Sequence, residues 1–154
     1  MRGEKEALAF FQAYLGEDRA FSRDLARPGP ILVLLPGETM QPPEEDCLAS
    51  PGGRWVVGAL RVPEGEFRGV EREGRIVSWA VAGRERHGAR LLTVETDWAF
   101  RGQGLAGQAL RALCRDLPGE VLIYLCDEKN GASLQAARKA GFELFGKICG
   151  EEGL

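Results

Sequence analysis

Residues 100–106 read Phe-Arg-Gly-Gln-Gly-Leu-Ala and lie between an apolar, β-branched run at 91–96 and a helical pattern that continues to 116. This order predicts a strand, a glycine turn and the start of a helix. Glycines at 102 and 104 allow consecutive backbone N–H groups to close on an anion, and the helix dipole adds partial positive charge there. Arg101 adds a full positive charge. We therefore predict a phosphate-binding turn at the start of this helix.

A second informative segment follows one further apolar strand, at 121–126. Residues 130–142 read Asn-Gly-Ala-Ser-Leu-Gln-Ala-Ala-Arg-Lys-Ala-Gly-Phe, which predicts a helix over 131–140 that Asn130 opens and Gly141 ends. The order strand, glycine turn, helix, strand and Asn-led helix indicates a coenzyme A site.

Composition limits the class of protein. A chain of 154 residues fits one domain, 1–154, with a core of its own. The net charge of -3, without a run of Lys and Arg, argues against a nucleic-acid partner. The longest aliphatic run, 31–35, is far shorter than the roughly 20 residues of a membrane helix. Residues 1–15 form an amphipathic pattern without an export signal, so we expect a cytoplasmic protein without a membrane partner.

The cysteines do not indicate a metal or disulfide framework. The four of them are scattered without a Cys-x-x-Cys pair, and His87 is the only histidine. We expect no metal site. Cys114 lies on the apolar stripe of its helix and is expected in the core.

The chain pattern predicts an α+β fold with a mixed, mostly antiparallel central sheet flanked by helices. Residues 36–53 are rich in Pro, Gly and acids and are expected to form an exposed loop whose mobility serves substrate access. A hairpin is expected around the turn at 72–75, and a βαβ unit follows it. The expected helices are 4–15, 18–26, 102–116 and 131–140, and the expected strands are 31–35, 55–60, 67–71, 76–82, 91–96, 121–126 and 143–148.

Over about residues 67–145 the chain resembles the GNAT superfamily of acetyl-CoA-dependent N-acetyltransferases. The family's phosphate-binding pattern is Arg or Gln, two residues, Gly, one residue, and Gly or Ala. Its later element is an Asn that opens a helix ending in Lys, one residue, Gly, Phe. The matching residues are Arg101, Gly104 and Ala106 for the first pattern and Asn130, Lys139, Gly141 and Phe142 for the second.

The resemblance implies the GNAT acyl-CoA N-acyltransferase fold and transfer of an acetyl group from acetyl-CoA to a primary amine, by direct attack in a ternary complex. The acceptor would be a small molecule or a peptide. The strand edge with Val94 and Thr96 would pair with the pantetheine arm, and Asn130 would lie beside that arm. The resemblance places the pyrophosphate on the backbone amides of Gly102, Gln103, Gly104, Leu105 and Ala106, and Arg101 would add its charge to this cofactor site. The acceptor's identity and the oligomeric state, a homodimer included, stay open.

One position departs from the family pattern. A tyrosine that protonates the departing thiolate often stands seven residues after the Asn, and here that position is Ala137. A thiol with a pKa of about 8.5 leaves tolerably well as thiolate, so the chemistry survives this loss. Ser133, Tyr124 and Cys126 lie nearby as candidates for the role, and the sequence does not choose between them. For Cys126 the simplest interpretation is a small core residue.

The acceptor amine must lose a proton, which calls for a base. Glu95 is our candidate, with Asp97 as a second; both lie at alternating positions of the strand before the turn, so both side chains are expected on one face.

Two other functions remain open. The first is an acyl-CoA-binding regulatory or structural module with eroded catalysis. The second is a nicotinamide-dinucleotide oxidoreductase, because residues 102–107 also match Gly-x-Gly-x-x-Gly and Asp127 follows the next strand. Residues 128–154 are too few for the further βαβ units that such a fold needs. Trp55 and Trp79 are expected in the core, whereas Trp98 is expected to shield the cofactor or to cap its strand.

Overall fold

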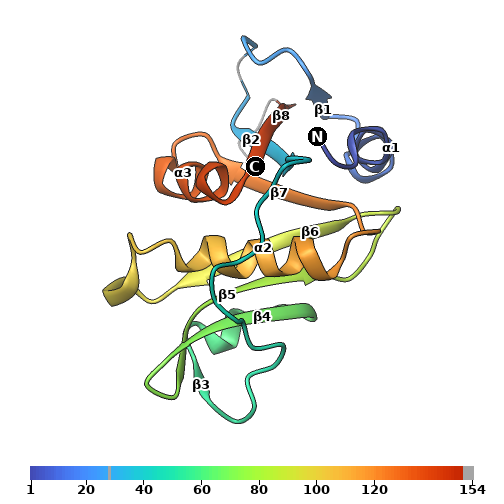
Figure 1. Ribbon diagram of the computed structural model, residues 1–154. Helices are drawn as coiled ribbons and strands as arrows, with labels where there is room; N and C mark the ends of the chain where they lie inside the picture. The colour runs from blue at the N-terminus through green and yellow to red at the C-terminus, as the bar shows by residue number, and fades with distance from the viewer. Residues whose placement is uncertain (28, 151–154) are drawn as a thin grey trace.

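The computed structural model describes residues 1–27 and 29–150, which form an eight-stranded mixed sheet flanked by three α-helices (Figure 1). The order in the sheet is β1-β8-β2-β7-β6-β5-β3, and β4 pairs with β5. Only β3 with β5 and β6 with β7 are parallel among these strands. The predicted α+β class is confirmed. The elements are α1 (Glu4–Tyr14), β1 (Arg19–Ser22), β2 (Ile31–Pro36), β3 (Trp55–Val56), η1 (Ala59–Arg61), β4 (Gly65–Arg72), β5 (Arg75–Gly83), β6 (Arg90–Thr96), η2 (Trp98–Phe100), α2 (Leu105–Asp116), β7 (Leu122–Asp127), α3 (Gly131–Ala140) and β8 (Phe142–Gly150).

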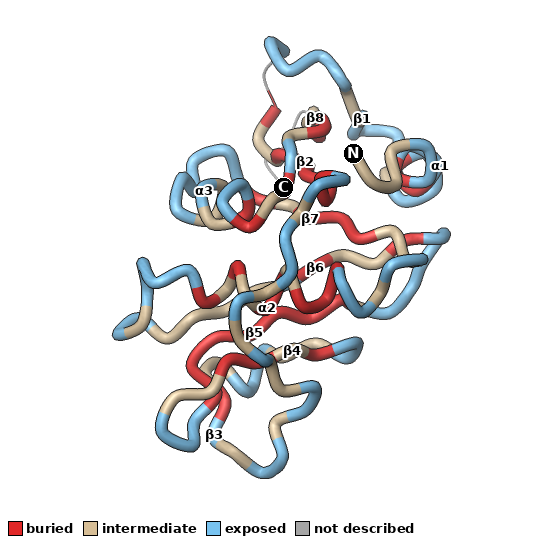
Figure 2. Tube along the Cα trace, in the orientation of Figure 1, coloured by how far each residue is buried: buried red, intermediate tan, exposed pale blue. Residues whose placement is uncertain are grey.

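The helices divide between the two faces of the sheet. Apolar residues of α2 at i, i+4, i+5 and i+8, from Leu105 to Leu113, are buried against β4, β5 and β6, and α3 packs beside them. On the other face, Phe10 and Phe11 of α1 pack on β2, β7 and β8. The buried positions accordingly follow the strands through the middle of the molecule, whereas the outer helix faces are exposed (Figure 2).

β2 lies between β7 and β8 and is antiparallel to both. Its residues alternate between the two faces: Leu32 and Leu34 pack under α2 and α3, whereas Val33 and Leu35 pack under α1. A strand that is covered on both faces needs apolar side chains throughout, which explains its continuous apolar sequence. The predicted strand at 31–35 is confirmed.

The predicted helix at 18–26 is wrong, because residues Arg19–Ser22 form strand β1 along the edge of β8. The ring of Phe21 stacks between Phe11, at 4.9 Å, and Phe145, at 5.2 Å. Gly146 allows this close approach, since a Cβ there would lie 2.4 Å from the Phe21 ring. Tertiary packing therefore outweighs the local helical pattern.

Two further predictions are corrected around β3. The expected strand at 55–60 is a strand of two residues, because Gly58 turns the chain with φ of 63° into η1. Trp55, expected in the core, is 51% exposed, whereas Trp79 is 1% exposed as expected. The hairpin predicted at 67–82 is confirmed and is longer, with β4 and β5 paired from residue 65 to residue 83.

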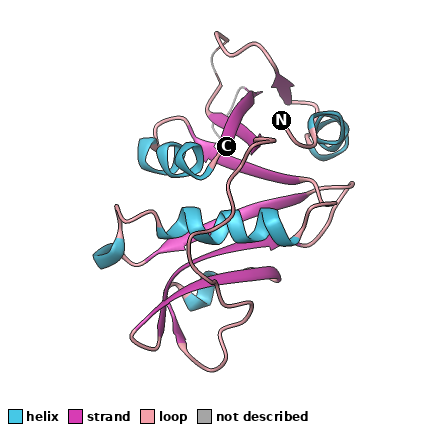
Figure 3. Cartoon of the chain, in the orientation of Figure 1, coloured by secondary structure: helices cyan, strands magenta, loops and turns pink. Residues whose placement is uncertain are grey.

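The loop expected at 36–53 passes across α2 (Figure 3) and is hydrogen-bonded to it. The backbone N–H of Glu44 donates to Gln108 Oε1 at 2.6 Å, and Leu48 forms a bridge with Gly69 of β4. Arg72 donates twice to the Glu45 carboxylate, at 2.8 and 2.9 Å. These attachments oppose the free motion that the sequence suggested.

Candidate functional site

The glycine turn lies between η2 and α2. Gly102 and Gly104 take left-handed backbone conformations, with φ of 80° and 74°, which glycine adopts without strain. A Cβ added at either glycine would meet no atom within 4 Å. The sequence placed the helix start at residue 102, but these conformations delay it to Leu105.

Six consecutive backbone N–H groups at this turn have no hydrogen-bond acceptor among the described residues. Among residues 1–27 and 29–150, no hydrogen bond uses the backbone N–H groups of residues 102–107. The first helical bond of α2 runs from Gln108 N–H to the carbonyl of Gly104, which has no side chain to cap the helix. The first turn also carries no acidic residue. Free N–H groups and the positive end of the helix dipole therefore fit an anion such as a pyrophosphate.

β6 and β7 separate next to this turn. They pair in parallel from Arg90 to Leu92, and the last pair is Leu92 with Tyr124. Both strands continue, β6 to Thr96 and β7 to Asp127, without further pairing to each other. An opening between two neighbouring strands results, and one side of it is the unpaired edge of β6.

Backbone groups of Val94 and Thr96 face that opening. The N–H of Asp97 donates to Val77 on β5, and the N–H of Arg90 donates to Val121 at the start of β7. Because the facing direction alternates along a strand, even-numbered residues of β6 turn their N–H and C=O groups away from β5. The two residues predicted at the pantetheine edge thus have backbone groups in position to pair with an extended ligand.

Arg101 and Gln103, also predicted at the cofactor, have exposed side chains. Arg101 Nε donates to the Thr96 carbonyl at 3.4 Å, which holds its cationic side chain beside the open edge of β6. In the first turn of α2, Ala106 is half-buried and Leu105 is buried in the core. Trp98 lies on η2 and is 81% exposed.

The two candidate bases lie at the end of β6 and one residue beyond it. Glu95 pairs across the sheet with Trp79, so its side chain lies on the face opposite α2. The Glu95 side chain lies against the turn before η1, since a Cβ added to Gly58 would be 3.2 Å from Glu95 Cγ. Asp97 instead lies beyond the end of β6 and accepts a hydrogen bond from Ala99 N–H at 3.0 Å. The Asp97 N–H still donates to Val77 on β5, so the ladder between β5 and β6 continues two residues beyond Glu95.

Asn130 begins α3, as predicted, and its side-chain oxygen accepts a hydrogen bond from Ser133 N–H at 3.1 Å. The side chain therefore has a structural task as helix cap. Its exposed position leaves the amide nitrogen without a hydrogen bond to any described residue.

The three candidates for the missing tyrosine differ in access. Tyr124 is 2% exposed, and its hydroxyl lies 2.8 Å from Ser133 Oγ. Burial raises the pKa of Tyr124 and also the pKa of the Cys126 thiol, so both groups stay protonated at neutral pH. Ser133 is half-buried on the first turn of α3 and is the most accessible of the three. Ala137 is fully buried, in a core position that a tyrosine would not fit without repacking.

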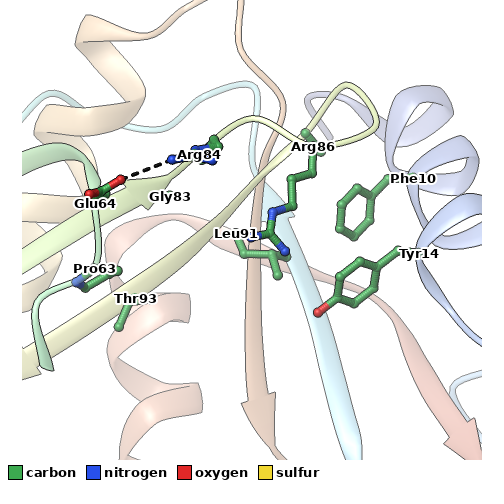
Figure 4. Close-up of a pocket in the computed structure, with 10 residues that line it drawn as sticks. Phe10, Tyr14, Pro63, Glu64, Gly83, Arg84, Arg86, Leu91 and Thr93 are labelled. Atoms are coloured by element: carbon green, nitrogen blue, oxygen red, sulfur yellow. Dashed lines mark hydrogen bonds and ion pairs between the residues drawn. The ribbon is translucent and has the colours of Figure 1, made fainter.

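The sequence analysis missed a cavity of about 430 Å³ on the face opposite α2 (Figure 4). Phe10 and Tyr14 of α1 form one wall, and Leu91 and Thr93 of β6 form another. The turn after β5 contributes Arg86. No motif marks these residues, because they come from separate segments of the chain.

Within residues 1–27 and 29–150, none of the helices has the length and apolar composition needed to cross a bilayer.

Comparisons with known proteins give consistent results. The family model of the GNAT acetyltransferases matches residues 32–142. A search of curated proteins gives no match. Among solved structures, a GNAT-family acetyltransferase from Colwellia psychrerythraea superposes with a TM-score of 0.63 at 17% identity, over 90% of this chain and 59% of that chain.

Two further structures are similar. A GNAT-family protein from Novosphingobium aromaticivorans gives a TM-score of 0.56 at 18% identity, over 88% of this chain and 69% of that one. A GCN5-related N-acetyltransferase from Kribbella flavida gives 0.52 at 17% identity, over 92% and 62%. The chain thus spans between about three fifths and seven tenths of the length of these proteins, and at these identities the likeness concerns the fold.

The glycine turn, the opening beside it and the Asn-led helix all fall within residues 32–142, which the family model matches. The mostly antiparallel sheet also excludes the doubly wound architecture that the dinucleotide alternative requires. The chain belongs to the GNAT family of acetyltransferases.

Proposed function

We propose that this protein transfers the acetyl group of acetyl-CoA to a primary amine by direct attack in a ternary complex. The observation that carries the proposal is the row of unpartnered N–H groups at residues 102–107, next to the unpaired edge of β6. The turn would bind the pyrophosphate, with Arg101 adding charge. The edge at Val94 and Thr96 would pair with the pantetheine arm, which points the thioester into the opening.

The protein's contribution to the chemistry is mainly positioning. Holding amine and thioester together replaces a bimolecular encounter by an intramolecular step. A backbone N–H of β6 would polarise the acyl oxygen as the amine attacks. Glu95 would take the proton of the amine, directly or through water, from the face opposite α2. The CoA sulfur would leave as thiolate, which its pKa of about 8.5 permits without a dedicated acid.

Calorimetric titration with acetyl-CoA, CoA and NADH tests the cofactor, and thiol release against a panel of amines tests the reaction. We expect acetyl-CoA to bind and thiol release to depend on the amine. Tight binding of NADH with no binding of acetyl-CoA would refute the proposal.

A second function, acyl-CoA binding without catalysis, is favoured by one observation, the buried Ala137 in place of the family's tyrosine. The same titration separates the two functions. Acetyl-CoA binding without thiol release on any amine of the panel would support this second function.

A further inference from the structure

We propose that the cavity between α1 and the turn after β5 binds the acceptor, and that it selects an amine that carries a carboxylate. This inference rests on the proposed function. It names a substrate class from the residues that line the cavity.

The position of the cavity connects it to the opening between β6 and β7. Leu91 and Thr93 line it from β6, and the pairing of β6 with β7 ends at Leu92. The cavity therefore reaches the level of the sheet where the two strands begin to separate. Glu95 follows Thr93 on the same face, about 7 Å further along the strand. An amine bound in the cavity and extending along β6 would approach both the thioester and the candidate base.

The wall that α1 contributes is rigid and aromatic. The rings of Phe10 and Tyr14 stack at 4.8 Å, and Phe10 also contacts Phe11 edge to face at 5.1 Å. Phe10 is almost fully buried, so it fixes the orientation of the more exposed Tyr14. A cavity of about 430 Å³ with such walls is in the size range of small-molecule sites.

One unpaired positive charge faces this wall. Figure 4 shows the guanidinium of Arg86 between Leu91 and Tyr14. No ion pair or hydrogen bond of this guanidinium occurs within residues 1–27 and 29–150, and the Tyr14 hydroxyl likewise has no partner there. The backbone of Arg86 is held by two hydrogen bonds with Ala89, of 2.8 and 3.0 Å, so the base of the side chain is fixed.

The other two charged residues that line the cavity, Arg84 and Glu64, pair with each other. This contact, at 3.2 Å between two exposed side chains, weakens the attraction of either group for a charged ligand. Arg90 donates to the Gly83 carbonyl and to Glu120. Among the described residues that line the cavity, Arg86 is thus the cation without a partner. A guanidinium can bind a carboxylate through two parallel hydrogen bonds.

The distance along β6 between the cavity and Glu95 sets how far apart the carboxylate and the amine of the acceptor must be. Leu91, beside Arg86, lies about 13 Å from Glu95 along the strand. An ω-amino acid or a short peptide can span more of this length than a free α-amino acid. All three share the amine and the carboxylate, and the experiment distinguishes them.

The test compares acceptors with and without the carboxylate. Thiol release from acetyl-CoA is measured with phenylalanine, 6-aminohexanoate and the dipeptide Gly-Phe, each beside its carboxamide. We expect at least one acid to have a KM about 10- to 100-fold below its amide. Arg86→Gln should remove this difference, Arg86→Lys should restore part of it, and Arg75→Gln, a matched change at the distant β4–β5 turn, should preserve it.

Binding of the same acids to the protein without acetyl-CoA, followed by NMR, separates the two proposals. Turnover that is equal for acids and amides, or unaffected by Arg86→Gln, would overturn the inference and leave the acetyltransferase in place. Acid binding that depends on Arg86, in a protein that does not bind acetyl-CoA, would support the carboxylate site and refute the proposed function.

Discussion

The hydroxyl of Tyr124 lies 2.8 Å from Ser133 Oγ, and this contact ties β7 to the first turn of α3 beside the opening. Because Tyr124 is buried, we expect Tyr124→Phe to lower the free energy of unfolding by about 1 kcal/mol, the net value of one hydrogen bond. Urea denaturation measures this change. Ser133→Ala should cost a similar amount, and the double variant should cost less than the sum of the two. Strict additivity would show that the two hydroxyl groups do not interact.

Gly104 should be essential for cofactor binding but not for folding. Gly104→Val places a branched side chain at the phosphate-binding turn, so we expect loss of acetyl-CoA binding in calorimetry. Gly74→Val is the matched control, since Gly74 has a similar φ of 77° and the same open surroundings, at a distant hairpin. Both variants carry the same backbone strain. Equal acetyl-CoA affinity in the two variants would contradict the assigned turn.

Glu95 should matter for turnover and not for affinity. Glu95→Gln removes the candidate base, so we expect kcat to fall by about 10² to 10⁴ while the Kd for acetyl-CoA is unchanged. Glu143→Gln on β8, an exposed strand glutamate on another part of the sheet, serves as control. A Glu95→Gln enzyme with the full rate would remove this residue as the base.

Asp116 should make the fold sensitive to acid. Hydrogen bonds from Arg115, and also from Arg68, lower the pKa of Asp116 to about 2. A carboxyl whose pKa is lowered on folding stabilises the protein above its unfolded pKa of about 4, and this contribution is lost as the pH falls toward 2. Asp116 is partly exposed, so at pH 7 we expect Asp116→Asn to cost about 1 kcal/mol or less.

The measurement for Asp116 is urea denaturation of both proteins at several pH values. The difference in unfolding free energy between wild type and Asp116→Asn should shrink between pH 4 and pH 2. A difference that stays constant over this interval would contradict the assigned ion pairs.

Gly146 should tolerate no side chain, because β1 crosses close to it. A Cβ at this position would lie 2.4 Å from the Phe21 ring and 2.5 Å from the Ser22 carbonyl oxygen. We expect Gly146→Ala to lower the free energy of unfolding by about 1 to 3 kcal/mol, measured by thermal or urea denaturation. Gly119→Ala, in open surroundings, should be nearly neutral. A stable Gly146→Ala protein would show that β1 is not fixed against β8.

The elements that the sequence predicted well have strong local patterns. β7 and β2 are continuous apolar runs, α3 has both a cap and a terminal glycine, and the hairpin has its turn residues at 73 and 74. The glycine turn was identified for the same reason, since its conformation depends on the residue type alone. These features are encoded within about ten neighbouring residues, so one sequence suffices to find them.

The features that the sequence missed depend on partners far along the chain. β1 forms because Phe21 packs between Phe11 and Phe145, and no local pattern signals that contact. The cavity combines α1, β6 and the turn with Arg86 in the same way.

The placement of β2 between β7 and β8 has a consequence for how the protein is made. β7 is one side of the opening, and its outer edge pairs with β2, which is synthesised about ninety residues earlier; β8, the partner of β2 on its other edge, is synthesised after both. Contacts of such long sequence separation form slowly. When the glycine turn has formed in a nascent chain, β7 on the other side of the opening is therefore not yet held in place by β2 and β8. We expect the ability to bind acetyl-CoA to arise only in the last steps of folding.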